Sequence, residues 1–221
     1  MDLEFLSQIL IIIGIDIVLG GDNAIVIALA CRNLPIDKRN KAIFLGTGLA
    51  IVVRIALTIL AVYLLMIPFL QLVGGLFLVY IAYNLLTEEG DDASKIRGGA
   101  TLFQAVRTIV VADLVMGFDN VLAVAGAAGG RIILVVAGLL ISIPIIVWGS
   151  KIILKFMERF PIIIYIGAGI LALTAGKMMT HEERIKPLLD TYSYSYYIIP
   201  IITIVFVLVS GLVKKTSTKK S

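Results

Sequence analysis

The sequence predicts an all-α membrane protein with about seven transmembrane helices. Of its 221 residues, 60% are hydrophobic and the mean hydropathy is +1.05, whereas soluble globular proteins average roughly 45–50% apolar residues. A helix of about 20 apolar residues can cross the hydrocarbon core of a bilayer. Seven stretches meet this requirement, near residues 5–31, 42–63, 66–86, 103–127, 131–150, 161–179 and 197–213.

The first and fourth stretches carry the same acidic motif. The sequence D-I-V-L-G-G-D-N at residues 16–23 recurs 97 residues later as D-L-V-M-G-F-D-N at residues 113–120. Across 16–28 and 113–125, six of thirteen positions are identical. A charged side chain at a helix centre costs about 2.5–3.5 kcal/mol to insert into a bilayer, so such residues usually mark an ion or proton pathway. The candidate site residues are Asp16, Asp22, Asn23, Asp113, Asp119 and Asn120.

The two motif copies predict an internal repeat of three helices. Because three is odd, the two copies would cross the membrane in opposite directions, and inverted repeats of this kind place the substrate near the midplane. We expect a first repeat at residues 1–86, a cytoplasmic linker at 87–100 and a second, inverted repeat at 101–180. Residues 181–221 would add an outer loop, an extra seventh helix and a basic cytoplasmic tail. The third helices match in small residues, whereas an alignment of the second helices puts Arg54 opposite Pro144.

The basic residues predict the orientation. Fourteen of the nineteen Lys and Arg side chains lie in the first, third and fifth linkers and the C-terminal tail, and four lie in the alternate loops. The positive-inside rule then places the N-terminus outside the membrane and the C-terminal tail in the cytoplasm. Residues 1–4 are not basic, so no cleavable signal peptide is expected. The charges flank membrane spans, so no nucleic-acid partner is expected.

Glycines in the motif predict a hinge. On an ideal helix, Asp16 and Asn23 share a face, while Asp22 points about 240° away from Asp16. Gly20 and Gly21, and Gly117 in the second copy, weaken the helix locally. An unwound segment would let Asp22 turn toward Asp16, which is allowed at membrane depth where the chain lines a cavity. The other interpretation is that these glycines allow close helix packing.

The residue types predict a site for a hard cation. Four carboxylates and two amide oxygens suit Mn²⁺, Mg²⁺ or Ca²⁺, and the motif has no His or Cys for zinc or copper. We expect the ion to be transported rather than held as a permanent cofactor. Four bare carboxylates repel one another, and Arg54 lies too deep in the second span for its charge to reach water. Arg54 is therefore a candidate counter-ion in the metal-free state, although a purely structural ion pair explains it equally well.

The paired motifs resemble the TerC family of integral membrane proteins. The resemblance rests on Gly-Gly-Asp-Asn at 20–23 and Gly-Phe-Asp-Asn at 117–120, and it covers nearly the whole chain with its seven-span layout. It implies manganese efflux across the bacterial plasma membrane, with these acidic residues as metal ligands. Members of the family are also linked to supplying manganese to secreted metalloproteins.

Two other classes of function compete with transport. An intramembrane aspartyl protease needs two aspartates that share a proton and typically a Gly-x-Gly-Asp motif, but Leu19 occupies the first glycine position. The chain is therefore not expected to be an enzyme. The alternative is a non-transporting metal sensor or a metal-loading partner of the secretion machinery. The sequence also leaves open a homo-oligomer.

Overall fold

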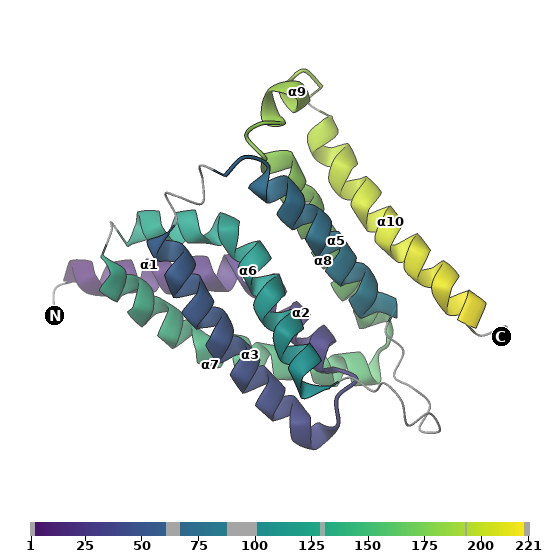
Figure 1. The fold of residues 1–221 in the computed structure, drawn as a ribbon. Coiled ribbons are helices and arrows are strands. Elements are labelled where there is room, and N and C mark those ends of the chain that lie inside the picture. The colour runs from purple at the N-terminus through teal and green to yellow at the C-terminus, as the bar shows by residue number, and fades with distance from the viewer. Residues whose placement is uncertain (1–2, 61–66, 88–100, 129–130, 193, 219–221) are drawn as a thin grey trace. The chain divides into compact units, whose positions relative to one another are not determined.

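The computed structural model describes residues 3–60, 67–87, 101–128, 131–192 and 194–218, and these are helical with no strand among them (Figure 1). The predicted linker, beyond Thr87, lies outside the described residues. The helices are α1 (Leu3–Leu19), α2 (Gly21–Cys31), α3 (Ile36–Ile59), α5 (Leu70–Thr87), α6 (Leu102–Ala127), α7 (Ile132–Arg159), α8 (Ile162–His181), α9 (Lys186–Asp190) and α10 (Ser195–Thr218).

The described helices account for five to six membrane spans. α3, α5, α7, α8 and α10 are each long and apolar enough to cross a membrane, and α1 and α2 together form a sixth candidate that is bent by 50°. α6 has 26 residues, which is a spanning length, but some of its side chains, including that of Asp119, lie outside the described part. The all-helical membrane class is confirmed, and the exact number of seven spans stays a prediction.

The chain divides into two compact units, which we describe separately. Unit 1 contains residues 1–66 and 100–156, and unit 2 contains residues 67–99 and 157–221. Unit 1 therefore holds α1, α2, α3, α6 and most of α7, including both copies of the acidic motif. Unit 2 holds α5, α8, α9 and α10.

Unit 1 is organised around the packing of α3 against α6, with α1 and α2 also against α6. Two glycines allow helices of this unit to approach each other closely. A Cβ atom on Gly46 of α3 would lie 2.7 Å from Ile109 Cδ1 of α6, and one on Gly138 of α7 would lie 2.4 Å from Ile12 Cγ2 of α1. An apolar core that includes Ile12 is formed by the buried side chains of Ile9, Ile12, Ile51, Val124, Ala128, Leu134, Val135 and Leu139. This packing brings both motif helices against α3.

Unit 2 is a bundle in which α8 packs against α5 and α10 (Figure 1). Small residues again set the spacing, because a Cβ atom on Gly75 would lie 2.7 Å from the Ala175 carbonyl oxygen and one on Gly176 would lie 2.4 Å from Pro200 Cα. The carboxylate of Glu182, which is buried, accepts hydrogen bonds of 3.1 Å from the backbone N–H groups of Phe69 and Gln71. Glu182 thereby satisfies donors that the start of α5 leaves unpaired.

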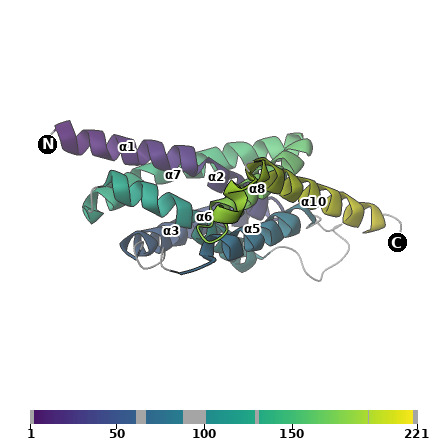
Figure 2. The same cartoon turned by 90° about the horizontal axis from the view of Figure 1, so that it is seen from above.

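Helices that occupy equivalent positions in the two halves of the sequence run in opposite directions. Within unit 1, α3 and α7 run in opposite senses, and within unit 2, α5 and α8 do so (Figures 1 and 2). An inverted repeat requires this relation between equivalent helices.

A candidate cation site

The chain breaks at the first glycine of the first motif. α1 ends at Leu19 and α2 begins at Gly21, with Gly20 between them at φ −98° and ψ 7°. The N–H of Gly20 still donates to the Asp16 carbonyl oxygen at 2.7 Å, so the chain turns within a single residue. The break separates Asp16, on the last turn of α1, from Asp22 and Asn23, on the first turn of α2. The two parts of the motif therefore belong to differently directed helices.

The second motif copy differs from the expectation of a matching hinge. α6 continues as a helix through Gly117, although its ribbon changes direction along its length (Figure 1). The side-chain amide of Asn120, on α6, donates to the Leu19 carbonyl oxygen at 3.4 Å. That carbonyl belongs to the last turn of α1, where the break removes its helical partner. Asn120 thus supports the broken end of α1, a role that the sequence interpretation did not include.

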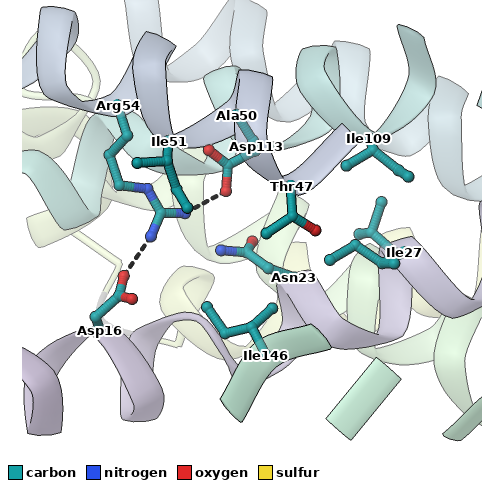
Figure 3. A pocket seen from close by; sticks show the side chains of 11 residues that line it. Asp16, Asn23, Ile27, Thr47, Ala50, Ile51, Arg54, Ile109, Asp113 and Ile146 are labelled. Carbon is teal, nitrogen blue, oxygen red and sulfur yellow. Dashed lines mark hydrogen bonds and ion pairs between the residues drawn. The ribbon is translucent and has the colours of Figure 1, made fainter. Parts of the chain in front are cut away.

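The first aspartate of each motif copy lines the same buried cavity in unit 1 (Figure 3). The cavity has a volume of about 20 Å³, which exceeds the roughly 10–15 Å³ that an ordered water molecule requires. Its polar lining comes from α1, α2, α3 and α6, and isoleucines and other apolar side chains complete it. The lining residues are Asp16, Asn23, Val26, Ile27, Thr47, Ala50, Ile51, Arg54, Ile109, Asp113 and Ile146.

Arg54 joins the two aspartates. Its Nη1 donates to Asp16 Oδ1 and its Nη2 donates to Asp113 Oδ1. Only 1% of Asp16, 3% of Arg54 and 8% of Asp113 is exposed, so all three charges lie inside the protein. Ionised groups are buried only when they are paired, because the loss of hydration is costly. Arg54 therefore acts as the internal cation of this site.

Helical spacing directs these side chains toward the cavity. Thr47, Ala50, Ile51 and Arg54 lie at relative positions 0, 3, 4 and 7 of α3, which places them on one face. Ile109 and Asp113 are four apart on α6 and share a face for the same reason. Ser142 of α7 also contacts this site. Its hydroxyl donates to Asp16 Oδ2 and lies 2.9 Å from the Leu139 carbonyl oxygen.

Several polar atoms at the cavity are buried without a hydrogen-bond partner among the described residues. They are both amide atoms of Asn23, the Thr47 hydroxyl, the Arg54 Nε and Asp113 Oδ2. Buried polar groups are almost always paired in folded proteins, so each exception needs an explanation. A bound ion or water in the cavity would satisfy the three oxygens, which are an amide, a hydroxyl and a carboxylate oxygen.

The structure brings together some of the predicted site residues. Asp16, Asn23 and Asp113 line the cavity, and half-buried Asp22 is within electrostatic range of the Arg54 guanidinium. Asn120 lies at the end of α1, and the side chain of Asp119 lies outside the described residues. Among the described side chains, no three His, Cys, Asp or Glu converge in a metal-binding arrangement, since Arg54 occupies the space between Asp16 and Asp113.

Sequence reasoning missed two polar residues, Thr47 and Ser142. Both are buried and both are neutral hydroxyls within apolar helices, where such residues commonly bond to their own backbone. The available signal was the helical spacing of Thr47 and Arg54, which are seven residues apart.

The helix break leads to a testable prediction, for which the neighbouring glycine provides the control variant. A Cβ atom at Gly20 would lie 2.3 Å from the Asp16 carbonyl oxygen, whereas one at Gly21 would meet nothing within 4 Å. We expect Gly20→Ala to lower stability by about 1–3 kcal/mol, as overpacking does, and to weaken Mn²⁺ binding because Asp16 must move. Gly21→Ala should keep both properties. Melting temperatures in detergent and Mn²⁺ titrations test this, and equal behaviour of the two variants would contradict it.

Comparison with known proteins identifies the family. The family model described as "Integral membrane protein TerC family" matches residues 1–219. The chain belongs to the TerC family. It is 47% identical over 212 residues to the "Uncharacterized membrane protein YjbE" of Bacillus subtilis strain 168, covering 96% of this chain and 97% of that protein. The expected resemblance is thus confirmed, and TerC membership with several apolar helices makes this chain a multi-pass integral membrane protein.

More distant relatives are longer proteins. The "Uncharacterized membrane protein YkoY" of B. subtilis is 26% identical over 72% of this chain and 55% of its own length. The "UPF0053 inner membrane protein YoaE" of Escherichia coli K12 is 26% identical over 74% of this chain and 35% of its own length. This TerC chain therefore matches about half of YkoY and about a third of YoaE. No solved structure matches it.

Proposed function

We propose that this TerC protein exports a divalent metal cation, with Mn²⁺ as the favoured ion, across the bacterial plasma membrane. The observation that carries the proposal is the buried cavity in which Arg54 is held between Asp16 and Asp113 while an oxygen of Asp113 has no described partner. A buried carboxylate oxygen without a described partner, on a residue that lines a cavity, is an available acceptor for a cation.

The charges at the cavity support a divalent ion. Asp16 and Asp113 pair with a single guanidinium, that of Arg54, and Asp22 lies within electrostatic range of it. When all four groups are ionised, three negative charges face one positive charge, and two negative charges remain. A divalent cation would neutralise them, which is favourable where water is excluded.

The donor atoms support a hard ion. The polar residues that line the cavity, apart from Arg54, offer carboxylate, amide and hydroxyl oxygens, which suit Mn²⁺, Mg²⁺ and Ca²⁺ better than zinc or copper. Manganese is favoured among these because the resemblance to the TerC family implies it. The proposed ligands are Asp16, Asp22, Asn23 and Asp113, with Asp119 and Asn120 from the second motif copy.

Arg54 gives the site a way to release its ion. An incoming cation would displace the guanidinium from the two aspartates, and the guanidinium would return when the ion leaves. In the empty site Asp16 and Asp113 each keep one oxygen paired with the guanidinium, which offsets part of the cost of their desolvation. This exchange lowers the energy of the empty protein, which is the form that must change conformation before the next cycle.

An inverted repeat of two three-helix halves would supply that conformational change. The opposite directions of α3 and α7, and of α5 and α8, support this arrangement. Seven spans with the N-terminus outside and the basic C-terminal tail in the cytoplasm fit the distribution of Lys and Arg. Export would then run from the side that carries the basic linkers.

The alternative function is a metal sensor or a metal-loading partner of the secretion machinery. A sensor needs a binding site but no passage through the membrane. Transport in purified liposomes separates the two. We expect the wild-type protein to move Mn²⁺ into liposomes that contain a manganese-quenched dye, and Asp113→Asn to reduce the initial rate about 100-fold. Binding of Mn²⁺ without any quenching would favour the sensor.

A further inference from the structure

The hydroxyl of Thr47 lacks the backbone hydrogen bond that a threonine inside a helix commonly makes. Helical threonines commonly donate to a carbonyl three or four residues earlier. Thr58 donates to Arg54 at 2.8 Å, Thr87 to Tyr83 at 3.0 Å and Thr203 to Pro200 at 2.8 Å. Thr47 makes no such bond to any described residue, although its Oγ1 is buried. Thr47 is one of the residues that line the cavity.

Two other unpartnered groups line the same cavity as Thr47. Asn23 is 5% exposed, Thr47 is 4% exposed and Asp113 is 8% exposed, so all three are more than nine-tenths buried. Figure 3 shows Asn23, Thr47 and Asp113 among the side chains that line the cavity, with the Thr47 hydroxyl on the side nearer Ile27. They contribute an amide oxygen, a hydroxyl oxygen and the second carboxylate oxygen of Asp113, none of which has a described hydrogen-bond partner.

We propose that Thr47 is a direct ligand of the transported cation, in a subsite formed with Asn23 and Asp113 Oδ2. The inference rests on the proposed function and adds a ligand outside both motif copies. The subsite is distinct from the Arg54 ion pair, because Arg54 engages the other oxygen of Asp113. A hard cation can therefore meet its first protein oxygens while the guanidinium is still in place.

This arrangement makes loading stepwise. The cation first exchanges part of its water shell for the neutral oxygens of Asn23 and Thr47 and for Asp113 Oδ2. Its positive charge then weakens the ion pair between Asp113 and Arg54, since the cation and the guanidinium share one carboxylate. Displacement of Arg54 from Asp16 and Asp113 follows, and both carboxylates become available to the ion.

Thr47→Val separates this role from a structural one. The substitution replaces the hydroxyl with a methyl of similar shape, and removal of a buried, unpaired polar group does not destabilise a protein. We expect the metal-free variant to melt at the wild-type temperature or higher. We expect its Kd for Mn²⁺ to rise about tenfold, at the lower end of what loss of a supporting group at a metal site costs. Thr47→Ser, which keeps the hydroxyl, should restore most of the affinity.

Thr203→Val is the matched control. Thr203 is a buried threonine in unit 2 whose hydroxyl bonds to the Ala172 carbonyl at 2.8 Å. Its substitution should lower the melting temperature and leave the Kd for Mn²⁺ unchanged, the reverse of the Thr47→Val result. The measurements are Mn²⁺ titrations by electron paramagnetic resonance and melting curves on the full chain in detergent.

The outcomes distinguish the Thr47 assignment from the proposed function. Wild-type Kd in Thr47→Val would overturn the Thr47 assignment and leave the proposed function standing. A lower melting temperature with unchanged Kd would show that the hydroxyl is structural. Absence of Mn²⁺ binding by the wild-type protein would overturn the proposed function, and the subsite with it.

Discussion

Replacement of Arg54 by glutamine is expected to make the stability of the protein depend on divalent metal. Arg54 is 3% exposed and pairs with two buried carboxylates. Removal of one partner from a buried ion pair costs about 3–5 kcal/mol, because the remaining charge has no compensation. The metal-free Arg54→Gln protein should therefore melt well below the wild-type protein.

Mn²⁺ should restore the stability that Arg54→Gln loses. A ligand at 100 times its Kd stabilises the folded state by about 2.7 kcal/mol, and in this variant the ion no longer competes with a guanidinium. The increase in melting temperature on adding Mn²⁺ should therefore be larger for Arg54→Gln than for wild type. Melting curves with chelator and with increasing Mn²⁺ measure this difference.

Arg131→Gln is the control for the same chemical change at the surface. Arg131 is exposed and donates to Gln8. Surface substitutions of this kind usually change stability by no more than about 0.5 kcal/mol. Equal stabilisation of Arg54→Gln and wild type by Mn²⁺ would show that Arg54 does not compete with the ion, and the exchange mechanism would be wrong.

The second large effect is expected from a variant that removes the two carboxylate charges and the guanidinium charge together. The triple variant Asp16→Asn, Arg54→Gln, Asp113→Asn replaces an ion-paired cluster with neutral hydrogen-bonding side chains. Replacement of a whole buried ion pair is often neutral for stability, unlike removal of one partner. We expect the triple variant to fold, to melt near the wild-type temperature and to bind Mn²⁺ at least about 100-fold more weakly.

Glu182→Gln controls for the loss of a buried carboxylate. Glu182 is 5% exposed and lies in unit 2, where it accepts from the start of α5. Its substitution should reduce stability without changing the Kd for Mn²⁺. Binding titrations by electron paramagnetic resonance report both variants. Wild-type affinity in a folded triple variant would mean that the ion binds elsewhere.

The sequence predicted the parts of this site that carry charge. Charged groups inside apolar segments are rare enough to stand out, so Asp16, Asp113 and Arg54 could be found without a structure. The meeting of both aspartates at one guanidinium could not, because it depends on how α3 packs against α6. The approach of Gly46 to Ile109 is part of that packing, and no local pattern records it.

The two motif copies differ in their backbone at the glycines. Gly20 and Gly21 are adjacent, and Gly20 occupies a position with no room for a Cβ atom. In the second copy a Cβ atom at Gly117, the equivalent of Gly20, would lie 3.7 Å from Leu57 Cδ1, which is an ordinary contact, so no close approach requires a glycine there. A single glycine costs a helix only about 1 kcal/mol relative to alanine, which packing of α6 against α3 can offset. The helix therefore continues through Gly117.

The sequence alone does not indicate which neutral polar residues contribute to the site. Thr47 and Ser142 belong to a residue class that is common in membrane helices and usually bonds to its own backbone. Only the atomic arrangement distinguishes Thr47, whose hydroxyl has no described partner, from Thr58 on the same helix.

Cellular manganese is the most direct test of export through this site. A bacterial strain that lacks its manganese exporters would carry either wild-type protein or the Asp16→Asn, Arg54→Gln, Asp113→Asn variant, at matched expression and manganese load. Elemental analysis would then measure intracellular manganese. We predict that the wild-type protein lowers the pool and that the folded triple variant leaves it unchanged. An equal fall with both proteins, or no change with either, would contradict export through the Asp16–Arg54–Asp113 site.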